Sequence, residues 1–171
     1  EAAAYEGENV LVIGGANSAG QAAMLLTRYA KSVTMLVRGE GLDDTMSAYL
    51  IDQLGAQPNF ELRTHTEVVE AAGGEHLESV RVHHKDTGDE TLDVSGMFIF
   101  IGSSPHSDIV KDLVELDEDG FVLTGPDLIR DGELPKSWPL DRQPLLMETS
   151  VPGIFAAGDI RSGVVRRVAS A

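Results

Sequence analysis

The 171-residue chain contains no cysteine, has few aromatic residues and carries little positive charge. Without cysteine, these residues form no disulfide, offer no thiolate nucleophile and supply no thiolate ligand to a metal. Only 13 Lys and Arg stand against 28 Asp and Glu, which gives a formal net charge of −15. Because this charge repels the phosphates of nucleic acids, we expect no nucleic-acid partner.

Long apolar runs are also missing, so we expect no transmembrane helix and no membrane partner. The first residues are polar and acidic, unlike a signal peptide. The hydrophobic content of 42% still allows one ordinary domain or slightly more. Together these properties favour a cytoplasmic protein.

The chain is organised around an apolar run that leads into a glycine-rich turn. Residues 10–13 predict a short buried strand, and residues 21–29 predict a helix. A strand, a tight turn and a helix N-terminus form the phosphate-binding corner of dinucleotide folds, where free N–H groups and the helix dipole hold a pyrophosphate. We therefore predict a cofactor site at Gly14, Gly15, Ala16, Asn17, Ser18 and Ala19. The alternative is a glycine-rich turn that binds no ligand.

A second apolar strand, residues 33–37, follows at the spacing of a βαβ unit and ends beside Arg38. An acidic residue at this position holds the ribose 2′-OH of NAD, whereas a basic residue suits the 2′-phosphate of NADP. Arg38 therefore favours NADP as the cofactor. The nearby Glu40 keeps NAD as an alternative, and Arg38 could also be a simple solvated charge.

The next segments predict an α/β fold with an unusual insertion. Residues 45–54 predict an amphipathic helix with one apolar face: Met46, Tyr49, Leu50 and Leu54. After a strand at 60–63, three short strands with turn residues between them predict an antiparallel β-meander: 66–71, 77–84 and 91–94. Residues 96–102 then suit a central strand of the parallel sheet, with Ile101 and Gly102 lining the site at its carboxyl end. A strand that simply ends at a turn is the alternative.

The chain has a different character from residue 103 onward. Residues 116–123 predict a hairpin, and residues 126–144 predict a long irregular segment that contains the only tryptophan, Trp138. An apolar strand then runs into Gly158 and Asp159, and a helix is expected from residue 160 onward.

The segment from Thr149 to Asp159 resembles a motif of flavoproteins that have two dinucleotide-binding domains, Thr-x-x-x-x-(Ile/Val)-Phe-Ala-x-Gly-Asp. The resemblance implies that Asp159 holds the ribityl hydroxyls of FAD and that Gly158 permits a close approach. It also implies that three further residues lie near the flavin ring: Arg166, Arg167 and Val168. The alternative is that Asp159 is only a helix N-cap.

Both motifs in this order resemble the low-molecular-weight thioredoxin reductases over nearly the whole chain. The resemblance is closest to a bacterial branch that is often fused to response-regulator or cyclic-nucleotide-binding domains, through these segments: 17–23, 46–47, 121–127, 138–140, 159–163 and 167–171. It implies a Rossmann-like NAD(P)-binding domain over residues 1–103 and a partial return segment of an FAD-binding domain over residues 104–171.

The resemblance implies an oxidoreductase that transfers a hydride from NADPH to FAD and on to a disulfide or another acceptor. The cofactors carry this chemistry, so we expect no catalytic side chain and no metal in this chain. Implied partners are a thioredoxin-like protein or a fused signalling domain, in a homodimer. Two alternatives stay open: a regulatory NAD(P)H- or flavin-binding module without turnover, and a ferredoxin- or quinone-type reductase.

The chain departs from the family at two places. The family follows its second strand with His-Arg-Arg and a further Arg, whereas Val37, Arg38, Gly39 and Asp43 stand here. The redox Cys-x-x-Cys of the family would lie immediately before Glu1, so its absence from these residues leaves the disulfide substrate open.

Overall fold

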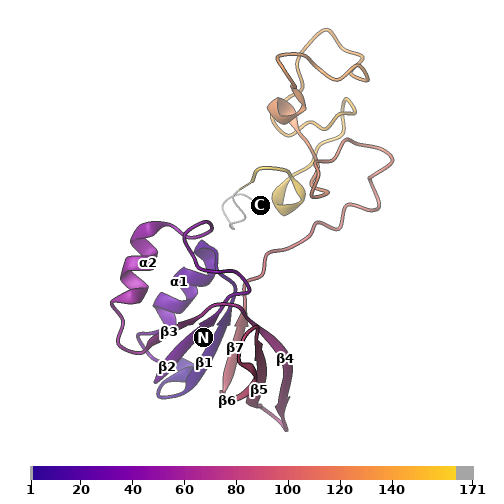
Figure 1. Cartoon of the computed structure of the whole chain (residues 1–171). Coiled ribbons are helices and arrows are strands. Elements are labelled where there is room, and N and C mark those ends of the chain that lie inside the picture. The colour runs from indigo at the N-terminus through magenta and orange to yellow at the C-terminus, as the bar shows by residue number, and fades with distance from the viewer. Residues whose placement is uncertain (1, 165–171) are drawn as a thin grey trace. The chain divides into compact units, whose positions relative to one another are not determined.

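A computed structural model describes residues 2–164 of the chain. The chain divides into two compact units, Glu1–Ile101 and Gly102–Ala171. Figure 1 draws both units, and each is described by itself below.

A four-stranded parallel sheet forms the centre of the first unit. Its strands lie in the order β3-β2-β1-β7, with these bounds: β1 Asn9–Ile13, β2 Ser32–Leu36, β3 Phe60–Arg63 and β7 Gly96–Ile99. The pairs are in register, with Val10 beside Val33 and beside Gly96. The two inner strands, β1 and β2, are rich in β-branched and aliphatic residues and are mostly buried, as expected where both faces of a parallel sheet are covered.

Two helices cover one face of this sheet, α1 (Asn17–Leu26) and α2 (Ala48–Gly55). Alternate strand residues point toward them, so Val10, Val12 and Met35 are buried in one core with the helices. Gly20 lets the two helices pack closely, because a Cβ at this position would come within 2.6 Å of Leu50 Cδ2.

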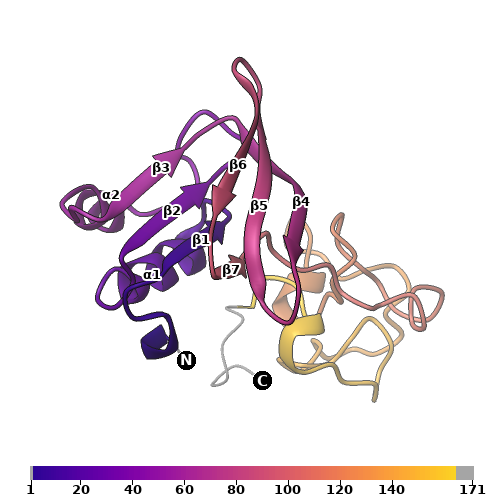
Figure 2. The same cartoon turned by 90° about the horizontal axis from the view of Figure 1, so that it is seen from below.

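The antiparallel meander covers the other face, as Figure 2 shows. It consists of β4 (Thr66–Gly73), β5 (Leu77–His84) and β6 (Gly88–Asp93), in the order β4-β5-β6. Leu11 and Leu36 from the parallel sheet are buried in a second core with Val80, Val82 and Val94. The first unit is therefore a three-layer α/β structure, and the predicted fold class is confirmed.

Three details of the prediction were wrong. Helix α1 begins at Asn17 and ends at Leu26, so residues assigned to the turn form its first turn. Strand β7 is an edge strand, because the meander packs over the sheet instead of adding a strand beyond β7. Tyr49 is 60% exposed although Leu50 and Leu54 are buried, since neighbours on a helix point about 100° apart.

The second unit has little regular structure within residues 102–164. It contains two short 3₁₀ turns, η2 (Gly125–Leu128) and η3 (Gly158–Ile160), and isolated bridges such as Leu116 to Val122 and Glu148 to Phe155. The predicted hairpin at 116–123 is present as the first of these bridges. The predicted strand before Gly158 is reduced to the second, because a strand needs a paired ladder that this segment lacks.

Candidate functional site: a dinucleotide-binding corner

The glycine-rich turn after β1 has a geometry that only glycine tolerates at one position. Gly14 has a φ of +126°, and a Cβ there would collide with the carbonyl oxygen of Phe100. Its N–H donates to the Leu36 carbonyl oxygen at 3.1 Å. The backbone at Gly14 is therefore still hydrogen-bonded to β2 before the chain turns away from the sheet. Gly14 therefore sets the sharp exit from β1 toward α1.

The N-terminus of α1 carries no cap from a side chain. The N-cap residue is Ala16, whose methyl group cannot accept a hydrogen bond, and the Gly20 N–H donates to the Ala16 carbonyl oxygen at 3.1 Å. The N–H groups of the first turn have no partner within a helix and carry the positive end of its dipole. Ala16, Asn17 and Ser18 are exposed around this end. These features fit a pyrophosphate group.

The segment before α2 supports the turn through three side-chain bonds. Thr45 Oγ1 donates to the Gly15 carbonyl oxygen at 2.7 Å. The Ser47 N–H and hydroxyl both donate to Asn17 Oδ1 at 2.9 Å. This support could not be predicted from the sequence, because residues 30 positions apart share no periodicity that would connect them.

The other predicted residues of this corner differ in their surroundings. Ala19 is fully buried in the core beneath the turn, so its contribution to the corner is the packing of α1 against the sheet. Arg38 is exposed and lies two residues after the end of β2. Ile101 is 71% exposed, and Gly102 is exposed with a φ of +88° at the start of the second unit.

Asp159 lies inside η3 and is exposed. The N-cap position of this turn is Ala157, so the interpretation of Asp159 as an N-cap is wrong. No side chain or backbone group within residues 102–164 forms a hydrogen bond or ion pair with the Asp159 carboxylate, which leaves it available to hydroxyl donors. Gly158 precedes it with a φ of +78°. Arg166, Arg167 and Val168 lie outside the described residues.

A buried carboxylate holds the segment that leads to Asp159. Glu148 has no exposed surface, and its two oxygens accept from Arg142 Nη1 and Nη2 at 2.7 and 2.8 Å. The backbone N–H groups of Leu145 and Gly153 also donate to it, each at 2.9 Å. The hydrogen bonds from Arg142, followed by that from Leu145, lower the pKa of Glu148 to about 2.

Trp138 belongs to the same cluster. Its Nε1 donates to the Arg142 carbonyl oxygen at 2.7 Å, and the Arg142 guanidinium lies 5.6 Å from the centre of its ring. Trp138 is buried within its own unit. The irregular segment of residues 126–144 is thus anchored by a tryptophan, an arginine and a glutamate.

The described residues contain no group of three or more His, Asp or Glu side chains that could hold a metal ion. His83 Nδ1 lies 2.6 Å from Asp89 Oδ1 on the meander. Over the same part of the chain, no helix has the length and the apolar character that a membrane span requires.

Comparison with known proteins identifies the family. Residues 2–171 match the pyridine nucleotide-disulphide oxidoreductase family. The chain belongs to this family. It is 31% identical to the thioredoxin reductase of Mycolicibacterium smegmatis over 98% of this chain and 48% of that protein. It is 32% identical to the NADPH-dependent thioredoxin reductase 3 of Arabidopsis thaliana over 98% of this chain and 28% of that protein.

Solved structures agree with this assignment. The thioredoxin reductase of Lactococcus lactis superposes with a TM-score of 0.74 at 27% identity, over 99% of this chain and 50% of that one. The chain therefore spans about half the length of this relative, and the resemblance to thioredoxin reductases drawn from its motifs is confirmed.

Proposed function

We propose that this chain is part of a flavoprotein that transfers a hydride from NADPH to FAD and on to a disulfide or another acceptor. The first unit would bind the pyridine nucleotide. The second unit would be a return segment of the FAD-binding domain. Nicotinamide and flavin supply the redox chemistry when bound, and this chain's residues would bind and orient them.

The corner at Gly14 carries the nucleotide part of the proposal. A strand ends at a residue that must be glycine, and the following helix begins without a side-chain cap. A pyrophosphate would accept from the exposed N–H groups around Ala16, Asn17 and Ser18. Gly15 and Ala19 would permit the close approach of turn, helix and sheet.

The FAD part rests on the motif from Thr149 to Asp159 and on the surroundings of its last residue. The exposed Asp159 carboxylate would accept hydrogen bonds from ribityl hydroxyls. Apolar side chains before it are exposed in this unit, among them Phe155 at 56%. An uncovered apolar surface of this kind suits a segment that packs against further structure in a complete FAD domain.

NADPH is proposed as the donor because Arg38 follows β2 and because one relative is named an NADPH-dependent enzyme. A thioredoxin-like partner is proposed because a relative from Mycobacterium leprae is named a bifunctional thioredoxin reductase/thioredoxin. A homodimer in the cytoplasm completes the proposal, from the family resemblance and the composition.

The test uses the whole protein that contains this chain, purified and held without oxygen. Its visible spectrum is recorded before and after NADPH or NADH is added. We expect a flavin spectrum that bleaches, faster with NADPH. A flavin that stays oxidised with both nucleotides would favour the regulatory module, and a protein without flavin would contradict the role of Asp159.

Two glycine substitutions test the corner itself. Gly14→Ala places a methyl group against the Phe100 carbonyl oxygen, so binding of both NADPH and NADH should weaken by more than about tenfold. Gly55→Ala is the control, because a Cβ there meets nothing within 4 Å. Flavin content reports whether each variant remains folded. Equal nucleotide binding by the two variants would contradict the proposed corner.

A further inference from the structure

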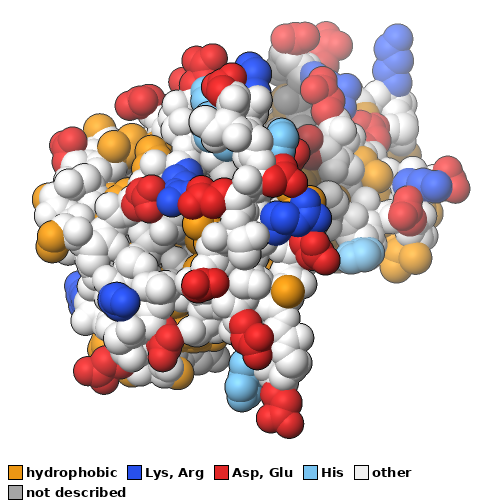
Figure 3. Space-filling view, turned by 60° about the horizontal axis from the view of Figure 1, so that its bottom comes forward, with side chains coloured by type: hydrophobic (Ala, Val, Ile, Leu, Met, Phe, Trp, Pro, Cys, Tyr) orange, Lys and Arg blue, Asp and Glu red, His pale blue; other side chains and the backbone are white. Residues whose placement is uncertain are grey.

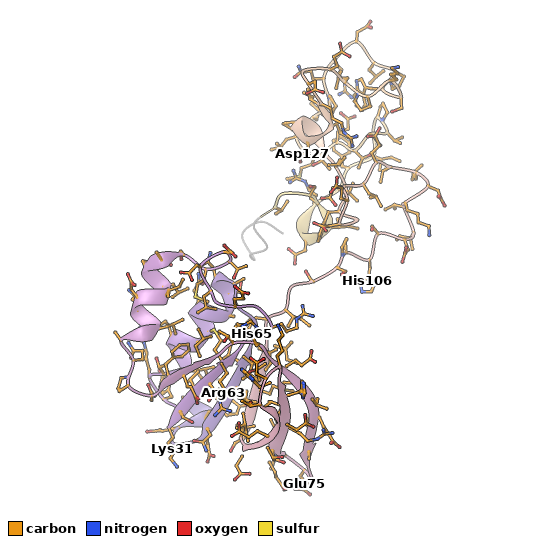
Figure 4. All side chains as sticks on the ribbon, viewed as in Figure 1. Lys31, Arg63, His65, Glu75, His106 and Asp127 are labelled. Atoms are coloured by element: carbon orange, nitrogen blue, oxygen red, sulfur yellow. The ribbon has the colours of Figure 1, made fainter. Side chains whose placement is uncertain are left out.

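A cleft of about 320 Å³ opens beside Arg38, two residues after the end of β2. Its lining combines the start of the meander with the end of the parallel sheet: Arg38, His65, Thr66, Glu67, His83 and Lys85. Four of these six residues have basic side chains. Figure 4 labels His65, which lies where β3 passes into β4, at the carboxyl end of the parallel strands.

Backbone hydrogen bonds hold the lining segments together. The Thr66 N–H donates to the Val37 carbonyl oxygen at 3.0 Å, and the His65 N–H donates to the Gly39 carbonyl oxygen at 3.1 Å. The Lys85 N–H in turn donates to the His65 carbonyl oxygen at 3.0 Å. The loop that carries Arg38 is thus joined to His65, and His65 is joined to Lys85. These residues belong to one fixed arrangement within the first unit.

Two of the basic side chains in this cleft have no acidic partner among the described residues. Neither Arg38 nor Lys85 forms an ion pair or a side-chain hydrogen bond within residues 2–164. By contrast, Arg63 and Arg81 of the same unit are each paired with two carboxylates. His83 is engaged by Asp89, so Arg38, Lys85 and His65 are the basic groups that remain for a ligand.

This concentration of basic groups contrasts with the rest of the molecule. Figure 3 shows a face on which acidic side chains are spread widely and Lys and Arg occur in small groups. The chain has a net charge of −15, and Glu67 is the one carboxylate in the cleft lining. Two unpaired cations that face one cleft in such a protein attract a compact anion, and a phosphate monoester carries nearly two negative charges.

We propose that Lys85 and His65 of the meander complete, with Arg38, a binding site for the 2′-phosphate of NADPH. This inference rests on the proposed function, since the end of β2 is where the adenosine ribose of a bound dinucleotide lies. Arg38 alone supplies one charge from an exposed loop. Lys85 adds the second charge, and the His65 ring adds a donor from a half-buried position.

The experiment measures dissociation constants of 2′,5′-ADP, 5′-AMP, NADPH and NADH for the whole protein and three variants. Lys85→Gln should weaken 2′,5′-ADP and NADPH about tenfold and leave 5′-AMP and NADH unchanged. His65→Asn keeps a residue that tolerates the local φ of +48° and should weaken the same two ligands about threefold. Lys31→Gln is the control, because it removes the same charge at the opposite end of the strands (Figure 4) and should change none of the four constants.

The outcomes separate this inference from the proposed function. Wild-type protein that binds neither NADPH nor NADH would overturn both. Binding of both, with Lys85→Gln equal to Lys31→Gln, would overturn only the assignment of Lys85. Inorganic phosphate is titrated as a separate probe. If Lys85→Gln weakens inorganic phosphate but leaves 2′,5′-ADP unchanged, the cleft binds free phosphate and the nucleotide assignment is wrong.

Discussion

Each of the two units of this chain is stabilised internally by a different kind of interaction. The first has two sheets and two helices around two apolar cores. In the second, isolated bridges and short turns surround a buried carboxylate with four donors. Apolar burial is spread over many residues, whereas a polar cluster depends on each of its members.

The two kinds of interaction make the units sensitive to different substitutions. In the first unit, truncation of one buried apolar side chain leaves the contacts among the other core residues in place. In the second, the loss of one acceptor leaves several donors without a partner at once. Hydrogen exchange measured amide by amide distinguishes the two cases, since it reports the opening of each region separately.

The largest effect is expected for Glu148→Gln. A carboxamide offers one acceptor oxygen where four hydrogen bonds now end, and its NH₂ group would face donors. Amide protection should fall throughout the second unit and stay unchanged in the first. Glu133→Gln, at an exposed carboxylate, is the control. Retained protection in Glu148→Gln would show that apolar contacts alone hold the second unit.

Acid should act on the same carboxylate in the wild-type protein. The pKa of Glu148 is about 2 in the folded unit, below its usual value of 4.5. The ionised group therefore stabilises the fold fully above pH 4.5, and this stabilisation is lost as the pH falls from about 4.5 to about 2. We expect protection of the second unit to decline over this range, and the dependence to be weaker in Glu148→Gln. An identical acid response in the two proteins would contradict the role of this group.

Leu11→Ala sharpens the comparison from the side of the first unit. Leu11 is fully buried between the parallel sheet and the meander, so its truncation should cost about 2–5 kcal/mol. Protection should fall in both layers because one core joins them. Leu25→Ala, at a side chain that is 47% exposed, should cost less than about 1 kcal/mol. A loss confined to the strand that carries Leu11 would show that the layers open independently.

The sequence was informative wherever one periodic pattern decided the structure. The strands at residues 60–63 and 77–84 were predicted with their observed bounds, and the strand predicted at 10–13 begins one residue earlier. Short apolar or alternating runs between turn residues have few other solutions. The start of α1 was misplaced by four residues, since Asn17, Ser18 and Gly20 look like turn residues and are tolerated in a first helical turn.

Features that depend on distant residues could not be predicted in this way. The bond from Thr45 to the turn, the four donors around Glu148 and the cleft between Arg38 and Lys85 each join segments that lie far apart in the sequence or have no regular pattern. Glu148 could not be singled out from the sequence, because burial of an acid is evident only once its donors are placed.

The smallest effect is expected at the bond that supports the glycine-rich turn. Thr45→Val removes the hydroxyl that donates to the Gly15 carbonyl oxygen and keeps the shape of the side chain. The site is exposed, so water can replace the lost donor, and global stability should change by less than about 1 kcal/mol. The turn would nevertheless be less well fixed, and binding of NADPH and NADH should weaken equally, about threefold.

The control is Thr91→Val, on the exposed surface of β6, which should leave the dissociation constants of NADPH and NADH unchanged. Because the affected carbonyl lies at the pyrophosphate corner and not at the ribose, a loss restricted to NADPH would contradict this account of the support.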